Sequence, residues 1–510
     1  MQRIIRALFN RVSLVAMAIL VQIFTLAVII WRFSNYFVIF DSALMIVSVF
    51  VVIYILNRRI NPAYKVAWII PILLFPILGG LFYLMVGGTG MSRQSKNSMR
   101  DITDKMKESL SQNSDTFNML REENKIAFNQ SSYIENYSLC PVYSGSATEF
   151  YSSGEELFEH LLEELSKAEK YIFLEFFIIE EGMMWNSVLN ILAEKVKNGV
   201  DVRVIYDDVG CVFTLPPGYD KKLEEMGIRC CIFNPFLPVL SFRLNNRDHR
   251  KIAVIDGKVA FTGGVNLADE YINEREKFGH WRDCAIKIKG EAVWNLTVMF
   301  LSMWNFLEKT HEDYCRFKPT EFYECAKCDG YVQPFDDSPL DDENISETVY
   351  LNLINQARKY VYIETPYLIV DNKMMASLSM AAKRGVDVRI LTPHIPDKWY
   401  AFAVTQSNYE ELLESGVSIY EYIPGFNHGK TFVVDDEYAV VGTINLDFRS
   451  LYLHFECGVW MYNTKSVAEV KNSSLKVYEV SKKISLEDIK NVSTIRKIGR
   501  TILKILAPLM

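Results

Sequence analysis

The sequence has no surplus of positive charge. Its 62 acidic residues outnumber its 55 basic residues, which gives a net charge of −7 at pH 7. A protein that grips duplex nucleic acid through its phosphates needs a lysine- and arginine-rich face, so this balance argues against nucleic acid as the partner. The nine cysteines are odd in number and scattered along the chain. They favour a reducing compartment over a disulfide framework.

A second matched cysteine pair is also lacking. One cluster combines metal-ligating residue types, at His311, Cys315, Cys325 and Cys328. Structural zinc sites usually pair their C-x-x-C with another such pair or with two histidines at fixed spacing. We therefore interpret the cluster as a cysteine-bearing loop between two halves of the chain, rather than as a zinc site, and expect no metal.

Long apolar runs, by contrast, are plentiful near the N-terminus. Half of all residues are hydrophobic, and the excess lies in residues 1–90. Segment 12–31 is apolar and uncharged, and at about 1.5 Å per residue it is long enough to cross a hydrocarbon core of about 30 Å. Segments 37–56 and 66–86 are similar. No small-residue cleavage site follows the first run, so we predict a membrane region and not a cleaved signal peptide.

Basic residues predict how this region is oriented. They precede the first run and follow the second, at Arg3, Arg6, Arg11, Arg58, Arg59 and Lys65. The positive-inside rule places both groups in the cytoplasm, with two spans between them. Segment 66–86 is broken by prolines and by Gly79 and Gly80. It either crosses as a third span or returns as a re-entrant hairpin. We favour the hairpin, which predicts a multi-pass protein of the cell membrane with its remaining domains in the cytoplasm.

Residues 91–132 are polar and predict a linker or an exposed helix. Beyond them the chain repeats itself. The stretch YIFLEFFII at 171–179 returns as YVYIETPYLI at 360–369, with Glu175 and Glu364 at the same relative place. Each copy alternates predicted strands and helices. We therefore expect an α/β fold of two similar tandem domains, packed as a pseudo-dimer, over residues 133–335 and 336–510.

The most specific repeated pattern is H-x-K-x-x-x-x-D followed, after six residues, by G-x-x-N. It occurs as RDHRKIAVIDGKVAFTGGVN at 247–266 and as FNHGKTFVVDDEYAVVGTIN at 426–445. Residues two apart on a strand point to the same face, so each copy places an imidazole beside an ammonium group. One copy alone would more often be surface decoration. If the two strands meet at the pseudo-symmetry axis, however, a single site contains His249, Lys251, His428 and Lys430.

Two further residue types complete each copy of the pattern. Asn266 and Asn445 offer side-chain N–H groups that suit phosphate oxygens. Asp256 and Asp435 belong to the signature, and we count them with its catalytic set. Their place at the end of each predicted strand nevertheless suggests structural acceptors more than chemical groups.

These residues make the chain, from about residue 133 to its end, resemble the phospholipase D superfamily, and within it the bacterial cardiolipin synthases. Three passages carry the narrower resemblance: NPAYKVAWIIPILLFPILGGLFYLMVGG at 61–88, HRKIAVIDGKVAFTGGVNLADEY, and GTINLDFRSLYLHFE. Asp248 and His454 stand where asparagine would be expected from that resemblance.

The resemblance implies transfer of a phosphatidyl group from one phosphatidylglycerol to another, giving cardiolipin and glycerol. His249 would be the nucleophile and form a phosphohistidine, and His428 would act as acid and base. The lysines and asparagines would supply the field that phosphoryl transfer often takes from Mg²⁺, so neither metal nor other cofactor is expected. Asp283 in WRD and Glu456 in HFE, at matching places in the repeat, would orient the imidazoles.

Other functions are compatible with parts of this pattern. Hydrolysis to phosphatidic acid, or phosphatidyl transfer to another alcohol, would pass through the same intermediate. A nucleic-acid phosphodiesterase would use the same residues, but the apolar segments and the net charge favour lipid. A membrane scaffold without catalysis would not need both histidines, both lysines and both asparagines.

The C-terminal stretch VSTIRKIGRTILKILAPLM, at 492–510, places isoleucines on one helical face and basic residues mostly off it. Such a helix either lies on anionic lipid or closes the domain.

Overall fold

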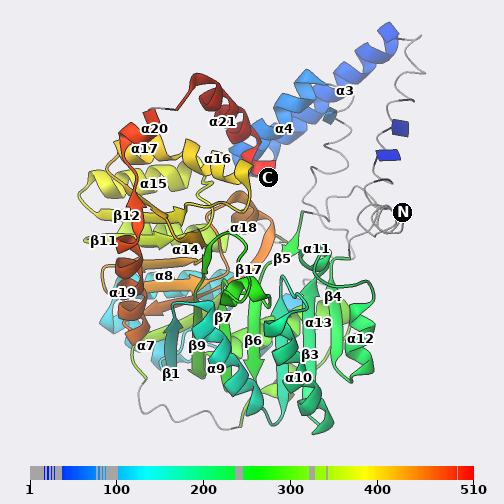
Figure 1. Cartoon of the computed structure of the whole chain (residues 1–510), viewed down its shortest axis with the longest axis vertical. Helices are drawn as coiled ribbons and strands as arrows, with labels where there is room; N and C mark the ends of the chain where they lie inside the picture. Colours follow the sequence, from blue (N-terminus) through cyan, green and yellow to red (C-terminus); the bar gives the residue numbers. More distant parts are fainter. Residues whose placement is uncertain are drawn as a thin grey trace.

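The computed structural model describes residues 37–75, 102–235, 245–320, 328–340, 343–490 and 492–509, with a few single positions before residue 102. Figure 1 shows two α/β units, the first in teal and green and the second in yellow to red, with the blue N-terminal helices projecting from one end.

The first unit is built on a seven-stranded sheet. Its strands β2, β3 and β4 run parallel to one another, and β6, β7, β9 and β1 continue the sheet in antiparallel pairs. Their buried runs are rich in Val, Ile and Phe, as strands covered on both faces require. In spatial order the strands are β1 (Ser146–Tyr151), β9 (Ala285–Gly290), β7 (Val259–Gly263), β6 (Lys251–Ile255), β2 (Tyr171–Phe176), β3 (Asp201–Asp207) and β4 (Arg229–Phe233).

The second unit repeats this order strand for strand and adds one edge strand. The predicted pair of tandem α/β domains is therefore confirmed. The expected boundary between residues 335 and 336 falls inside β10, the first strand of this sheet. The strands are β10 (Tyr331–Asp337), β17 (His454–Tyr462), β16 (Tyr438–Gly442), β15 (Thr431–Val434), β11 (Tyr360–Glu364), β12 (Asp387–Pro393), β13 (Ser418–Tyr422) and β18 (Ser481–Lys483).

Helices cover both sheets. In the first unit they are α9 (Gly154–Ser166), α10 (Met183–Lys197), α11 (Asp208–Cys211), α12 (Tyr219–Glu225) and α13 (Val293–Glu308). In the second they are α14 (Ile345–Gln356), α15 (Asn372–Lys383), α16 (Trp399–Ser407), α17 (Tyr409–Glu414), α18 (Phe448–Tyr452), α19 (Lys465–Glu479) and α20 (Leu486–Lys490). A further helix, α21 (Thr494–Leu506), packs on α16 and α4.

One helix ties the two units together through a shared hydrophobic cluster. Every residue of α13 from Val293 to Asn305 is buried, as expected for a helix that is apolar on all sides. Phe300 of α13 stacks on Phe173 of β2 with ring centroids 4.6 Å apart. The same hydrophobic cluster continues through the second sheet to Val440 and Trp460. The units therefore share one hydrophobic cluster, while the opposite face of the first sheet packs with α9 and α10 in a second cluster.

The polar stretch 91–132 is more structured than a linker. Residues 91–101 lie outside the described ranges, but α7 (Ser114–Glu123) follows, and α8 (Lys125–Ser138) packs on α14 and β10. Leu120 and Ala127 are fully buried in the shared core. The apolar positions that anchor these helices are few, which is why the composition reads as polar.

The N-terminal region contains α3 (Phe37–Asn57) and α4 (Pro62–Leu74). The Asn61 side chain caps α4 by accepting a hydrogen bond from the Ala63 N–H at 2.9 Å, and Pro62 occupies the first helical turn. Within the described ranges, the structure contains no helix with enough length and apolar character to cross a membrane. Most of segment 12–31 and part of segment 66–86 lie outside those ranges, whereas segment 37–56 lies in α3. The three predicted spans therefore stay predictions.

The predicted cysteine-bearing loop is described in part. Cys315 is exposed in a short 3₁₀ helix (Tyr314–Phe317), Cys328 is disulfide-bonded, and Cys325 lies outside the described ranges.

Candidate active site

Two short strands bring the H-x-K segments of the two units together. Strand β5 (Arg247–Asp248) in the first unit pairs with β17 of the second, and β14 (Gly425–Asn427) in the second pairs with β8 (His280–Arg282) of the first. The chain continues the same contacts one residue further. The His249 N–H donates to the Phe455 carbonyl at 3.0 Å, and the His428 N–H donates to the Arg282 carbonyl at 2.7 Å. Each histidine is thus fixed to the opposite unit.

The carboxylates that orient the histidines are exchanged between the units. His249 Nδ1 lies 2.9 and 3.0 Å from the two carboxylate oxygens of Glu456. His428 Nδ1 lies 2.6 Å from Asp283 Oδ2. Both carboxylates are fully buried. A carboxylate on Nδ1 favours the tautomer with the proton there, which leaves Nε2 of each ring free for chemistry.

Neighbouring residues hold these carboxylates in place. The Thr443 hydroxyl donates to Glu456 Oε2, and the Cys284 N–H donates to Asp283 Oδ1 at 2.8 Å. Gly264 occupies the position that corresponds to Thr443 in the repeat. A Cβ at Gly264 would come 1.9 Å from Asp283 Oδ1, so only glycine leaves room for this carboxylate. The two copies of the pattern differ at this position, G-G-V-N against G-T-I-N. This difference reflects the different ways in which Asp283 and Glu456 are held.

The two lysines lie beside the histidines in nearly complete burial. Lys251 Nζ donates to the His249 carbonyl at 2.5 Å, and Lys430 Nζ donates to the His428 carbonyl. Burial lowers the pKa of Lys251 to about 7 and that of Lys430 to about 8, against attraction from Glu456 and Asp283. The site therefore contains desolvated cations, and a bound anion would stabilise their charged forms.

The surroundings of both histidines favour the neutral imidazole. Burial, with the positive charge of Lys430, lowers the pKa of His428 to about 4. Burial and the two lysines also lower the pKa of His249 well below its usual value. A neutral imidazole has the lone pair that a nucleophile needs. An imidazole that donates a proton instead requires negative charge nearby, which a phosphodiester would bring.

The two asparagines differ in how they are held. Asn266 Oδ1 accepts from the Ile178 N–H at 2.9 Å, and its Nδ2 donates to the Tyr271 hydroxyl at 2.7 Å. One Nδ2 hydrogen of Asn266 is left over for another acceptor. Asn445 is buried, and its Oδ1 has no hydrogen-bond partner in the described part of the chain. Their expected role in binding phosphate stays a prediction.

The two aspartates of the repeated pattern, Asp256 and Asp435, directly follow β6 and β15, at the ends of these strands away from the histidines. Asp256 accepts three backbone N–H groups, from residues 169, 170 and Tyr171, at 2.7 to 2.8 Å. Asp435 does the same for residues 358, 359 and Tyr360, at 2.6 to 2.9 Å. Each is five residues from its lysine, a distance of roughly 16 Å along a strand. They pin the starts of β2 and β11 and do not contact the histidines.

Glu175 and Glu364, which occupy matching places in the repeat, each form an ion pair with an arginine. Arg250 donates to Glu175 at 2.5 Å and to Asp248 at 3.1 Å, all within the first unit. Glu364 of the second unit instead accepts from Arg282 of the first, at 3.2 Å from both Nε and Nη2. Sequence reasoning missed this second crossing contact, although Arg282 stands next to Asp283 in the WRD stretch.

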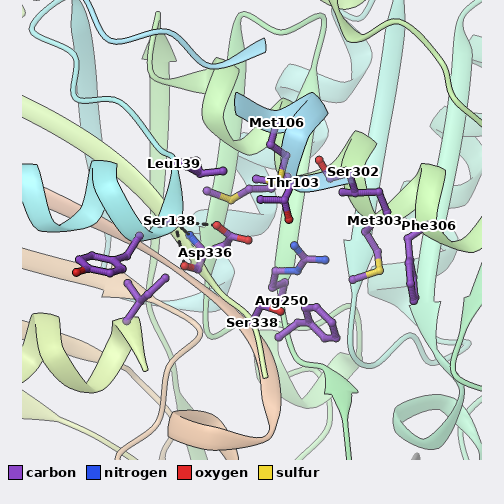
Figure 2. A pocket seen from close by; sticks show the side chains of 15 residues that line it. Thr103, Met106, Ser138, Leu139, Arg250, Ser302, Met303, Phe306, Asp336 and Ser338 are labelled. Carbon is purple, nitrogen blue, oxygen red and sulfur yellow. Dashed lines mark hydrogen bonds between the residues drawn. The ribbon is translucent and has the colours of Figure 1, made fainter. Parts of the chain in front are cut away.

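A small cavity of about 100 Å³ is lined by Arg250, the residue between His249 and Lys251. Figure 2 shows Arg250 and Asp336 in it, with Met303 and Phe306 of α13 and Met106 along its wall. Arg250 stands between His249 and Lys251 in the chain, so its side chain points to the opposite face. Ligand pockets usually measure about 300 to 1,000 Å³. This cavity is therefore too small to bind a lipid. The residues that line it support the segment that carries His249.

A third histidine, His454, lies beside the pair formed by His249 and Glu456. His454 has its ring centroid 5.6 Å from that of His249, and its Nδ1 is 3.7 Å from Glu456 Oε1, beyond hydrogen-bond distance. Neither ring nitrogen of His454 has a hydrogen-bond partner in the described part of the chain. Donor atoms of His249, His454 and Glu456 lie within 4.8 Å of one another. This is a residue set of the kind that binds zinc, so the expectation of a metal-free site needs a direct test.

We predict that anion binding to this site weakens as the pH rises. Lys251 and Lys430, with pKa values lowered to about 7 and 8, are charged below pH 7 and lose their protons above it. The probe is dimethyl phosphate, which stays monoanionic throughout, and its affinity is measured by titration calorimetry. Affinity should fall by at least about tenfold between pH 7 and pH 9, since the charged fraction of Lys430 alone falls by about that factor.

The variant Lys251→Met should bind the probe weakly already at pH 7. Lys471→Ala, which removes a surface lysine paired with Asp436, is the control and should bind as the unaltered protein does. Affinity that stays constant from pH 6.5 to pH 9.5 would show that the lysines do not carry the anion site.

Comparisons with known proteins agree on one family. Residues 161–304 and 350–476 match the family described as "Cardiolipin synthase, PLD-like domain", and residues 43–88 match "Phospholipase_D-nuclease N-terminal". An uncharacterised protein of Streptococcus mutans is 43% identical over 90% of this chain and 99% of its own. A cardiolipin synthase of Alkalihalophilus pseudofirmus is 33% identical over 94% of this chain and 95% of its own.

Among solved structures, the phosphatidylserine synthase of Haemophilus influenzae aligns with a TM-score of 0.55. The alignment covers 75% of this chain and all of the other, at 17% identity. At that identity the likeness establishes a common fold and nothing further.

Proposed function

The chain belongs to the cardiolipin synthase family of phospholipase D-like proteins, and we propose that it transfers a phosphatidyl group from one phosphatidylglycerol to another. The products are cardiolipin and glycerol. The observation that carries the proposal is the exchanged pair of histidine–carboxylate contacts beside two buried lysines. Family membership makes the protein a phosphatidyltransferase, and the geometry supports the steps below.

In the first step His249 Nε2 attacks the phosphorus of the donor lipid. The bond from phosphorus to the glycerol headgroup oxygen breaks, and His428 gives its proton to that oxygen. Glu456 stabilises the positive charge that develops on the His249 ring. A phosphatidyl group is then joined to His249, and neutral glycerol leaves.

In the second step His428 is neutral and acts as the base. It takes the proton from a headgroup hydroxyl of a second phosphatidylglycerol, whose oxygen attacks the phosphorus on His249. The phosphorus–nitrogen bond breaks and cardiolipin is formed, with His428 protonated again for the next cycle. The covalent intermediate conserves the phosphodiester, so no nucleotide is consumed.

Lys251, Lys430 and the two motif asparagines supply positive charge and N–H groups to the phosphate oxygens. In a buried site such preorganised groups stabilise the charge of the transition state strongly. Asp283 has the matching task for His428, because it stabilises that ring each time it carries a proton. Asp256 and Asp435 support the strands and take no part in proton or phosphoryl transfer.

We further propose that the protein is held in the cell membrane by its N-terminal apolar segments, with both α/β units in the cytoplasm. The runs at 12–31, 37–56 and 66–86 and the flanking basic residues support this arrangement. The match of residues 43–88 to the family described as "Phospholipase_D-nuclease N-terminal" overlaps the second and third of these runs. The substrates, being membrane phospholipids, are then within reach of the site.

We predict that the purified protein converts phosphatidylglycerol alone into cardiolipin and glycerol in equal amounts, as measured by mass spectrometry. His249→Ala and His428→Ala should each lower the rate by at least about 10⁴-fold, since each removes an essential group. His394→Ala, which removes a surface histidine paired with Glu421, is the matched control and should keep the rate.

Phosphatidic acid as the only lipid product would identify a hydrolase, and turnover of nucleic acid without lipid turnover would identify a phosphodiesterase. Near-normal turnover by either active-site variant would contradict the single shared site.

We predict that EDTA leaves the rate unchanged, because the positive charge comes from Lys251 and Lys430. The rate is measured after dialysis against EDTA, with the metal content determined by mass spectrometry. A rate that disappears on dialysis and returns with Zn²⁺ would show that His249, His454 and Glu456 hold a required metal. In that case the metal-free steps above would be wrong.

A further inference from the structure

The last helix of the chain presents an uncovered apolar stripe. Every described residue of α21 is at least partly exposed. Its four isoleucines line one face, as their spacing of three or four residues predicts, and their exposed fractions are high for this residue type. They are Ile495 (83%), Ile498 (56%), Ile502 (54%) and Ile505 (38%). A helix that closed a domain would bury this face, so that alternative does not account for it.

The remainder of α21 is basic. It carries Arg496, Lys497, Arg500 and Lys504 and no acidic residue, although the whole chain is acidic. Arg500 donates to Gln406 of α16, while Arg496, Lys497 and Lys504 are exposed. An exposed apolar stripe with a basic opposite face is the pattern of a helix that lies in the surface of an anionic bilayer. The charge complements an anionic partner, and the isoleucines complement an apolar one.

An exposed tryptophan extends this surface toward the active site. Trp399, at the start of α16, is 71% exposed, and α16 packs against α21. Tryptophan is enriched at the boundary between bilayer and water. The preceding residue, Lys398, donates to the Tyr367 hydroxyl at 2.8 Å, and its charge acts on His249. Ala401 of α16 packs in one cluster with Phe448, three residues beyond Asn445, so the surface adjoins a segment that leads directly from the site.

The end of α21 is anchored to the N-terminal helices. Ala507 packs with Ala63 and Tyr64 near the start of α4, and Leu509 packs with Trp68 of α4. Figure 1 shows α21 and α16 beside α4, at the end of the molecule from which α3 projects. The stripe thus lies at the same end as the segments that we propose to be in the membrane.

We propose that α21, together with Trp399, forms a docking face that lies on anionic phospholipid and holds the active site against the bilayer. This inference rests on the proposed function, since it assigns the surface from which the lipid substrate is taken. It goes beyond that function because it assigns a second membrane contact, separate from the N-terminal segments. The basic residues of this contact would favour anionic over neutral phospholipid.

The test uses the full chain in detergent-stabilised form and after reconstitution. An environment-sensitive fluorophore is attached at residue 498 of an Ile498→Cys variant, with Cys315 replaced by serine because it is an exposed free cysteine. Emission should shift to the blue in vesicles that contain 30% phosphatidylglycerol in phosphatidylcholine. It should shift much less in pure phosphatidylcholine, and the difference should shrink in high salt.

A kinetic test separates docking from chemistry. The double variant Ile498→Ser with Ile502→Ser should lower the rate on vesicular phosphatidylglycerol about tenfold. It should leave the rate on a short-chain phosphatidylglycerol, supplied as dissolved monomers, unchanged. The control is Phe213→Ser, which removes an 81% exposed apolar side chain from the first unit and should affect neither rate.

Each other outcome overturns the docking face. Equal loss on both substrates would make α21 a structural helix, and loss on neither would leave the stripe without this role. A blue shift in detergent without lipid that grows with protein concentration would identify a second copy as the occupant. If the unaltered protein failed to convert phosphatidylglycerol, the proposed function would fail, while the fluorophore at residue 498 would still report docking.

Discussion

The exchange of carboxylates between the two units is the contact on which the site depends. His249 is oriented by Glu456 and His428 by Asp283, so neither unit alone contains a complete catalytic pair. The strand pairings β5 with β17 and β14 with β8 impose this exchange, and the shared core around α13 keeps the units in register. A small relative movement of the units would disturb both histidines at once. The fold is therefore best understood as one composite site supported by two similar halves.

The second constraint is electrostatic. Two lysines, two neutral imidazoles and two carboxylates are buried together, and the pKa shifts of the lysines and histidines arise first from burial. Such a site is poised for an anion, because a phosphodiester would stabilise the ammonium groups and the imidazolium together. Around it, Arg250 and Arg282 are neutralised by Glu175 and Glu364, so they brace the strands and do not compete for the substrate.

The sequence was enough to predict the repeat, the α/β class, the histidine and lysine pairs and both orienting carboxylates. These follow from local patterns that occur twice. It was not enough to predict which carboxylate binds which histidine, because that pairing joins residues far apart in the chain, as does the contact of Arg282 with Glu364. The tight space at Gly264 is a matter of Cβ geometry and not of composition. The helices within 91–132 were hidden by their polar surfaces, and the expected membrane spans remain unconfirmed.

The most direct test of the account is to find where the phosphatidyl group is attached during turnover. Radiolabelled phosphatidylglycerol is mixed with the His428→Asn variant, quenched rapidly at alkaline pH, where phosphohistidine survives better, and digested for mass spectrometry. This variant lacks both the acid that helps glycerol to leave and the base of the acceptor step. Attack is therefore slow, but the adduct is not passed on, and the account predicts that label accumulates on His249. Adding Glu456→Gln, which removes the carboxylate contributed by the other unit, should suppress that label. Label on His428 in the otherwise unaltered protein, or no covalent label in any variant, would contradict the mechanism.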